Sequence, residues 1–138
     1  MIRNAAELAE VRKNWEGVEA LRERIQRSAF ASMGVIGGSF PVALVNAAHN
    51  LPFFHACGVL ERALWVLAHE GHFRCKSKYL GPLLEASEHT LPWQDYALIK
   101  TGVDRRNGVA HHGQLLDRGE CWKYVDAIKA ELQSWRIV

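Results

Sequence analysis

The residues best suited to chemistry lie in one short stretch, Asp104 to Gly113, which reads DRRNGVAHHG. It combines two adjacent arginines, an asparagine and two adjacent histidines. An arginine guanidinium is permanently charged and offers a phosphate a rigid fork of donors, whereas an imidazole with a pKa near ~6.5 exchanges protons at neutral pH. Cleavage of an RNA phosphodiester uses both groups, because proton transfer serves the ribose 2′-hydroxyl and the leaving oxygen while a cation stabilises the phosphoryl oxygens. The stretch therefore predicts a phosphate-directed site that requires no metal.

The spacing leaves two pairings of arginine and histidine open. Arg106 and His111 are five residues apart, and a five-residue step on an ideal helix turns about 500°, so the side chains point roughly 140° apart. We expect them to converge if the helix loosens or ends here, because Gly108 lowers helix propensity by roughly 0.8–1.0 kcal/mol relative to Ala and Gly113 suits a C-terminal stop. The alternative pair, Arg105 and His112, is seven residues apart and shares one helix face, about 20° out of register.

The segment RNGVAH, Arg106 to His111, resembles the signature of HEPN domains (higher eukaryotes and prokaryotes nucleotide-binding). That signature is an arginine, a polar residue that is often asparagine, ~4–6 intervening residues in all, and a histidine. The resemblance covers Leu51 to Trp135, and HEPN domains are helical bundles of about this length with the motif late in the chain. It implies a metal-independent endoribonuclease that attacks single-stranded RNA through the 2′-hydroxyl, and usually a homodimer whose two motif copies face each other.

The resemblance also implies roles for the motif residues. Arg106 would bind and polarise the phosphate, His111 would act as acid or base, and Asn107 would orient the pair. HEPN ribonucleases commonly act in toxin–antitoxin pairs or antiviral defence, so a neutralising antitoxin is an expected partner besides RNA or a nucleotide. The alternative is a non-catalytic HEPN-like module that binds a nucleotide or another protein and dimerises.

Three further residues are candidates to support the motif. Many HEPN domains carry an acidic residue on an earlier helix near the arginine, and Glu61 is the counterpart here. Arg105 and His112 join it because each stands next to a motif residue of its own type. A structural interpretation of the whole stretch is also open, since arginines and histidines at a helix C-terminus favour the helix dipole and bind its last carbonyls without further function.

A second basic segment, FRCKSKY, is a candidate RNA-binding loop. Arg74, Lys76 and Lys78 alternate with other residues and have Phe73 and Tyr79 around them. Cations track a nucleic-acid backbone, and aromatic rings stack on bases. The simpler interpretation is a solvated basic loop, which is common in proteins.

Composition predicts one ordinary globular domain over residues 1–138. Apolar residues make up 49% of the chain and charged residues 23%, and the formal charge of +2 neither demands nor excludes a nucleic-acid partner. Three irregularly spaced cysteines and no signal-peptide pattern favour the reducing cytoplasm. We predict no cofactor and no metal, because His69, His72 and Cys75 follow no common zinc spacing. We also predict no membrane span, since the apolar stretch 33–48 is short and broken by glycines and a proline.

Hydrophobic periodicity predicts a single all-α bundle of four or five main helices. Apolar residues recur at three- and four-residue steps in most of the chain, and no alternating run suggests a strand. Between the first two long helices the glycines at 34, 37 and 38 predict a loop, followed by a short helix that begins near Pro41. The expected helices cover residues 5–31, 41–48, 50–70 and 79–87, then a helix from 92 that ends at the 104–113 stretch, and a last helix from 118 to 135. Asn50 and Asp117 are the expected N-caps, and Gly71 and Gly113 the expected stops.

Overall fold

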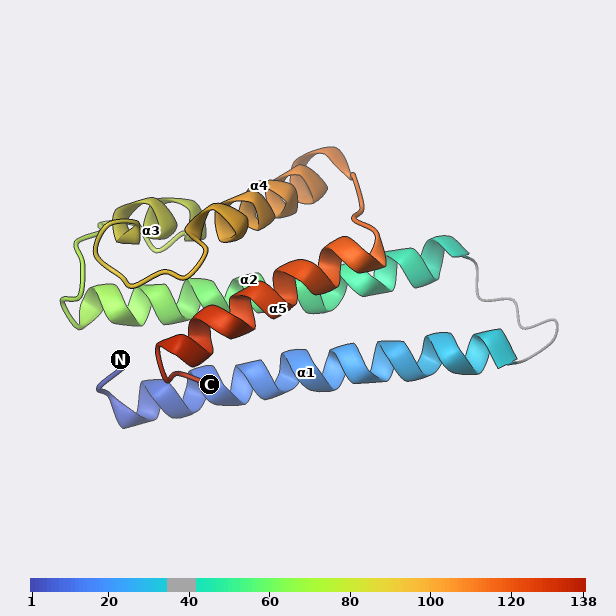
Figure 1. Ribbon diagram of the computed structural model, residues 1–138, viewed down its shortest axis with the longest axis horizontal. Helices are drawn as coiled ribbons and strands as arrows, with labels where there is room; N and C mark the ends of the chain where they lie inside the picture. Colours follow the sequence, from blue (N-terminus) through green and yellow to red (C-terminus); the bar gives the residue numbers. More distant parts are fainter. Residues whose placement is uncertain (35–41) are drawn as a thin grey trace.

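The computed structural model confirms the predicted all-α bundle (Figure 1), and the residues that it describes form five helices. It describes residues 1–34 and 42–138, with side chains described for 1–27 and 47–138, and within those ranges it has no strand. The predicted glycine loop at 35–41 lies outside the described residues. The helices are α1 (Ala5–Gly34), α2 (Val42–His69), α3 (Leu80–Ser87), α4 (Tyr96–His112) and α5 (Arg118–Ser134).

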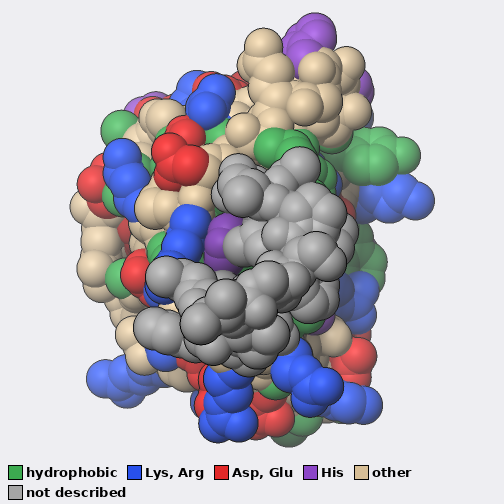
Figure 2. All heavy atoms as spheres, turned by 90° about the vertical axis from the view of Figure 1, so that its right-hand side faces the viewer, with side chains coloured by type: hydrophobic (Ala, Val, Ile, Leu, Met, Phe, Trp, Pro, Cys, Tyr) green, Lys and Arg blue, Asp and Glu red, His purple; other side chains and the backbone are tan. Residues whose placement is uncertain are grey.

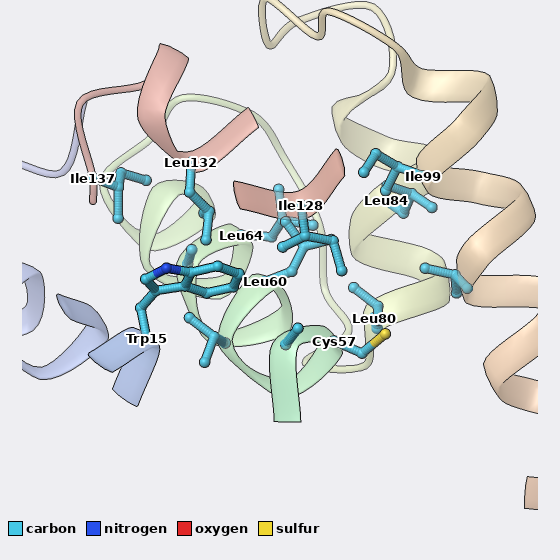
Figure 3. Close-up of a cluster of buried hydrophobic side chains, with 14 of the residues drawn as sticks. Trp15, Cys57, Leu60, Leu64, Leu80, Leu84, Ile99, Ile128, Leu132 and Ile137 are labelled. Atoms are coloured by element: carbon cyan, nitrogen blue, oxygen red, sulfur yellow. The ribbon is translucent and has the colours of Figure 1, made fainter. Parts of the chain in front are cut away.

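Helix α2 is the centre of the bundle. It packs against α1, α3 and α5, while α4 rests on α5 and α3, so α1 lies on one side of α2 and the α3–α4 pair on the other (Figure 1). The core side chains from all five helices meet around it, as the close-up in Figure 3 shows for Trp15 of α1, Leu60 and Leu64 of α2, and Ile128 of α5. Burial of this apolar surface is the main force that holds the motif-bearing helix to the rest of the chain.

Helix α1 begins where its pattern predicts. Val11, Trp15 and Val18 are buried at steps of three and four residues and face the core. Asn4, a residue the sequence interpretation passed over, caps the helix, because its side-chain oxygen accepts hydrogen bonds from Ala6 N (3.0 Å) and Glu7 N (3.2 Å).

The predicted division of α2 into two helices is wrong. One helix runs from Val42 to His69 with Pro52 inside it, although an internal proline removes a backbone hydrogen bond and costs about 3 kcal/mol or more. Pro52 and Asn50 are both buried, so tertiary packing outweighs the local break signal. The predicted stop is confirmed, since Gly71 follows the helix with φ 83°.

Helix α2 also contains a stretch, Ala47–His69, that by length and composition alone is apolar enough to cross a membrane. Of the 18-residue apolar window within this stretch, 56% is buried inside the bundle. A central helix enclosed by α1, α3 and α5 needs such a composition to form a core.

Helix α4 begins four residues later than the predicted start at Pro92. Its N-cap is Asp95, whose carboxylate accepts a hydrogen bond from Leu98 N at 3.0 Å. The buried carboxylate of Glu131 on α5 accepts hydrogen bonds from Gln94 N and Asp95 N, at 3.0 and 2.7 Å. These contacts hold the preceding segment in a non-helical conformation and fix where α4 starts.

Candidate functional site

The arginine–histidine motif lies on the last turns of α4. The helix is continuous from Tyr96 to His112, so it does not loosen at Gly108, and it ends at Gly113 as predicted. Gly113 is left-handed (φ 66°), and its N–H donates to Val109 O at 3.0 Å. On such a helix Arg106 and His111 leave the axis roughly 140° apart and about 7.5 Å apart along it.

Arg105 is part of the fold. Its Nε donates to Glu120 Oε1 at 2.7 Å and its second terminal nitrogen donates to Glu120 Oε2 at 3.0 Å. The Tyr124 hydroxyl donates to the same carboxylate at 3.1 Å. Hydrogen bonding from Arg105 lowers the pKa of Glu120, so the pair is charged at neutral pH. Arg105 therefore binds α5. Its contact in the structure is with Glu120 and not with His112, the alternative partner that the spacing suggested.

The same region of α5 sets how closely α4 approaches. Gly102 is buried against the Tyr124 ring, and a Cβ added to Gly102 would lie 2.8 Å from Tyr124 Cδ1. Sequence analysis missed Glu120 and Tyr124 as residues that position the motif. A usable signal was the Asp117-to-Glu120 spacing at the start of α5, where Asp117 accepts a hydrogen bond from Glu120 N at 2.8 Å and confirms the predicted cap.

Arg106 has a different environment. It is half-buried, with its guanidinium carbon 6.0 Å from the centre of the Phe54 ring on α2. Its Nε is buried and has no hydrogen-bond partner, and no described residue forms an ion pair with it. Burial raises the pKa of the nearby Cys57 thiol to about 12 against the opposing charge of Arg106, so this cysteine is a neutral core residue.

The other motif residues are more open. Asn107 is half-buried, and His111 and His112 are exposed in the last turn. Figure 2 looks along the bundle from the end where α4 finishes, and histidine side chains project at its upper edge. His111 is therefore accessible from solvent.

The segment that leaves the motif is fastened to α2. Asn50 donates through Nδ2 to Leu116 O at 3.1 Å and accepts through Oδ1 from Leu116 N at the same distance, and both residues are buried. Asn50 thus joins the central helix to the chain just after Gly113, instead of capping a helix as predicted.

Glu61 has a structural partner. Its Oε2 accepts a hydrogen bond from Leu80 N at 2.8 Å, at the start of α3, where an anion is favoured by the helix dipole. No described contact joins Glu61 to Arg106, and each of these two side chains affects the pKa of the Cys57 thiol only through its charge. The Glu61 carboxylate binds the start of α3, and the supporting role that the family resemblance implies for it stays a prediction.

The basic loop after α2 is only partly as predicted. Arg74, Lys76 and Lys78 are exposed, and Tyr79 is 65% exposed with Lys78 Nζ 5.8 Å from its ring centre. Phe73, however, is only 5% exposed and belongs to the core, so its predicted availability for base stacking is wrong. The buried Phe73 ring holds this otherwise exposed loop against the hydrophobic core.

The described residues contain no group of three or more His, Cys, Asp or Glu side chains arranged to hold a metal ion. Two of the three candidate zinc residues have local contacts. His69 Nδ1 lies 3.0 Å from Trp65 O, and the Cys75 thiol donates to Ser77 O at 3.6 Å.

Comparison with protein families, curated proteins and solved structures gives no match for this chain. The fold and the site together define a helical bundle with an arginine–histidine motif at the exposed end of one helix. Any closer assignment depends on the motif itself and on the chemistry of its surroundings.

Proposed function

We propose that the protein is a metal-independent endoribonuclease of the HEPN type that cleaves single-stranded RNA. The observation that carries the proposal is the contrast between its two adjacent arginines. Arg105 is neutralised by Glu120, whereas Arg106 has a buried Nε without a partner. The Arg106 guanidinium is only half-buried and forms no ion pair with a described residue, so a phosphate oxygen can pair with its charge through the terminal nitrogens.

The reaction divides between the two motif side chains. His111, or a histidine of a second copy, removes the proton from the ribose 2′-hydroxyl, and the 2′-oxygen attacks phosphorus as the bond to the 5′-oxygen breaks. The products are a 2′,3′-cyclic phosphate and a 5′-hydroxyl end, to which an acid returns the proton. Arg106 stabilises the charge that builds on the phosphoryl oxygens, and Asn107 orients the pair.

The continuous helix favours a homodimer for this chemistry. Since Arg106 and His111 leave α4 roughly 140° apart, one copy directs them to different sides. A second copy with its motif facing the first, as the family resemblance implies, would set the arginine of one beside the histidine of the other. A cytoplasmic role with an antitoxin as partner belongs to the same proposal.

The test is cleavage of an end-labelled, mixed-sequence single-stranded RNA in EDTA by the wild type and by Arg106→Ala, His111→Ala and His89→Ala. His89→Ala is the matched control, because it removes an exposed imidazole that lies outside the motif. We expect cyclic-phosphate products from the wild type and His89→Ala, and a rate about 10²–10⁴-fold lower for His111→Ala. Equal activity of all four proteins, or equal silence, would contradict the proposal.

The divergence of Arg106 and His111 also favours a second candidate, a non-catalytic nucleotide-binding module. In that case no variant changes a cleavage rate, because there is none. Arg106→Ala would instead weaken binding of a fluorescent nucleotide while His111→Ala would not, since of these two side chains only Arg106 carries a permanent positive charge for a phosphate.

A further inference from the structure

Cations without a carboxylate partner lie at two places along one side of α2. Beyond its C-terminal end is the basic loop, where none of the three cations Arg74, Lys76 and Lys78 forms an ion pair with a described residue; near its middle is Arg106, over Phe54. Arg62, which lies between Phe54 and the loop in the sequence, is by contrast paired with Glu7 at 2.6 Å.

The surface of α2 between Phe54 and the basic loop is hollowed. Five residues line the hollow: Gly58, Glu61, Arg62, Trp65 and Lys78. A Cβ added to Gly58 would meet no atom within 4 Å, so this turn of α2 is open. The only carboxylate among these lining residues belongs to Glu61, and it accepts a hydrogen bond from Leu80 N. The hollow therefore offers an anion one cation without a carboxylate partner, Lys78, while the Glu61 carboxylate is directed at the start of α3.

The hollow and Arg106 share one face of α2. Phe54, Gly58 and Glu61 are separated by four and three residues, which places them in one row on a helix. The row rises about 10 Å from Phe54 to Glu61. Arg106 stands at the Phe54 end of this row, and Lys78 stands at its Glu61 end.

We propose that this row is the track along which single-stranded RNA reaches Arg106. The proposal rests on the proposed function and adds the path of the substrate to it. One phosphate binds at Lys78, the strand crosses α2 at the open turn of Gly58, and the next phosphates reach Arg106. Tyr79, 65% exposed beside Lys78, provides a ring for base stacking, whereas Trp65 is already covered by Arg62 and His69, at 4.5 and 3.8 Å from its ring centre.

The charge pattern favours RNA over a second protein copy as the occupant. The cores of protein–protein interfaces are depleted of lysine and consist of large packed side chains. This row has an empty position at Gly58 and free cations at its ends, which suits a flexible polyanion.

The test measures binding of a fluorescent single-stranded RNA by anisotropy in the His111→Ala background, where no cleavage interferes. Gly58→Glu sets a negative charge in the open turn, Gly58→Gln fills the same space without charge, and Ala130→Glu makes the same charge change on an exposed position of α5. We expect Gly58→Glu to weaken binding about tenfold or more and Ala130→Glu to have little effect, with Gly58→Gln in between. Lys78→Gln should reduce the slope of log affinity against log salt by about 1.

Three outcomes would overturn the track. The first is equal RNA affinity of Gly58→Glu and Ala130→Glu, and the second is no RNA binding at all. The third is light scattering that shows a dimer for the parent and a monomer for Gly58→Glu, which would make the row a self-association surface. Failure of the proposed function looks different: RNA binding that depends on Gly58 and Lys78, together with a wild type that cuts nothing, would keep the track and remove the nuclease.

Discussion

Two glycines of α4 offer a sharp test of how the motif helix is built. Gly108 lies between Arg106 and His111, and a Cβ added there would meet no atom within 4 Å. Gly102, six residues earlier in the same helix, would place its Cβ 2.8 Å from the Tyr124 ring. The same change to alanine is therefore expected to have opposite effects at the two positions.

The magnitudes follow from two opposing contributions. Alanine favours a helix interior by roughly 0.8–1.0 kcal/mol over glycine, and at Gly108 nothing opposes this gain. At Gly102 the added methyl group forces a ring or a helix to shift, which typically costs about 1–3 kcal/mol. We expect Gly108→Ala to raise the free energy of unfolding by about 1 kcal/mol, or about 3 °C in Tm, and Gly102→Ala to lower it by about 0–2 kcal/mol.

Urea unfolding followed by circular dichroism measures both values, and RNA cleavage by Gly108→Ala adds a functional readout. Because α4 is continuous through Gly108, the alanine variant should keep wild-type activity if the protein is a nuclease. A Gly108→Ala variant that is less stable, or that is stable but inactive, would refute this reasoning and show that the helix must open between Arg106 and His111.

The remaining predictions concern the contacts that hold the motif helix and its exit. Asn50→Ala leaves the buried N–H and C=O of Leu116 without partners and should lower the free energy of unfolding by about 2–4 kcal/mol. Hydrogen exchange at the Leu116 amide should also become faster. Unchanged exchange at this amide would contradict the role of Asn50. Because hydrogen bonding from Arg105 lowers the pKa of Glu120, the folded state binds fewer protons than the unfolded chain in acid, and this stabilisation is complete above pH 4.5 and lost as the pH falls through the folded pKa. Glu120→Gln should therefore flatten the acid side of a plot of urea midpoint against pH, and a plot as steep as that of the wild type would argue against the Arg105 contact.

Local patterns were sufficient for most of the fold. The stripe of Val11, Trp15 and Val18 predicts a helix, and the structure buries all three residues. Asp117 and Gly113 act as the predicted cap and stop because each depends only on chain geometry within one turn. Such signals are short-range, so they are readable without knowledge of the tertiary structure.

The misses share a different cause. Pro52 looks like a helix start from its neighbours alone, but burial of the surrounding helix outweighs its local cost. Phe73 looks like a stacking residue, yet its place in the core depends on where the loop folds back. Local sequence contains no information on such long-range contacts.

The candidate site divides in the same way. The positions of Arg106 and His111 near the end of a helix follow from the motif and Gly113. The assignment of Arg105 to the fold depends on Glu120, fifteen residues later and on another helix. No spacing rule connects Arg105 with Glu120. Which of the two adjacent arginines belongs to the fold therefore becomes clear only when α4 is packed against α5.

The Arg105–Glu120 contact also has an evolutionary consequence. A bidentate pair is lost when either partner changes, so in related chains positions 105 and 120 should be retained or replaced together. A lysine at 105 would be a poor substitute because it lacks the planar fork. Position 106 would vary independently of 120, since its side chain makes no described contact with α5. Covariation of positions 105 and 120 therefore identifies the structural arginine in an alignment. It also shows which arginine of each related sequence should be aligned with Arg106.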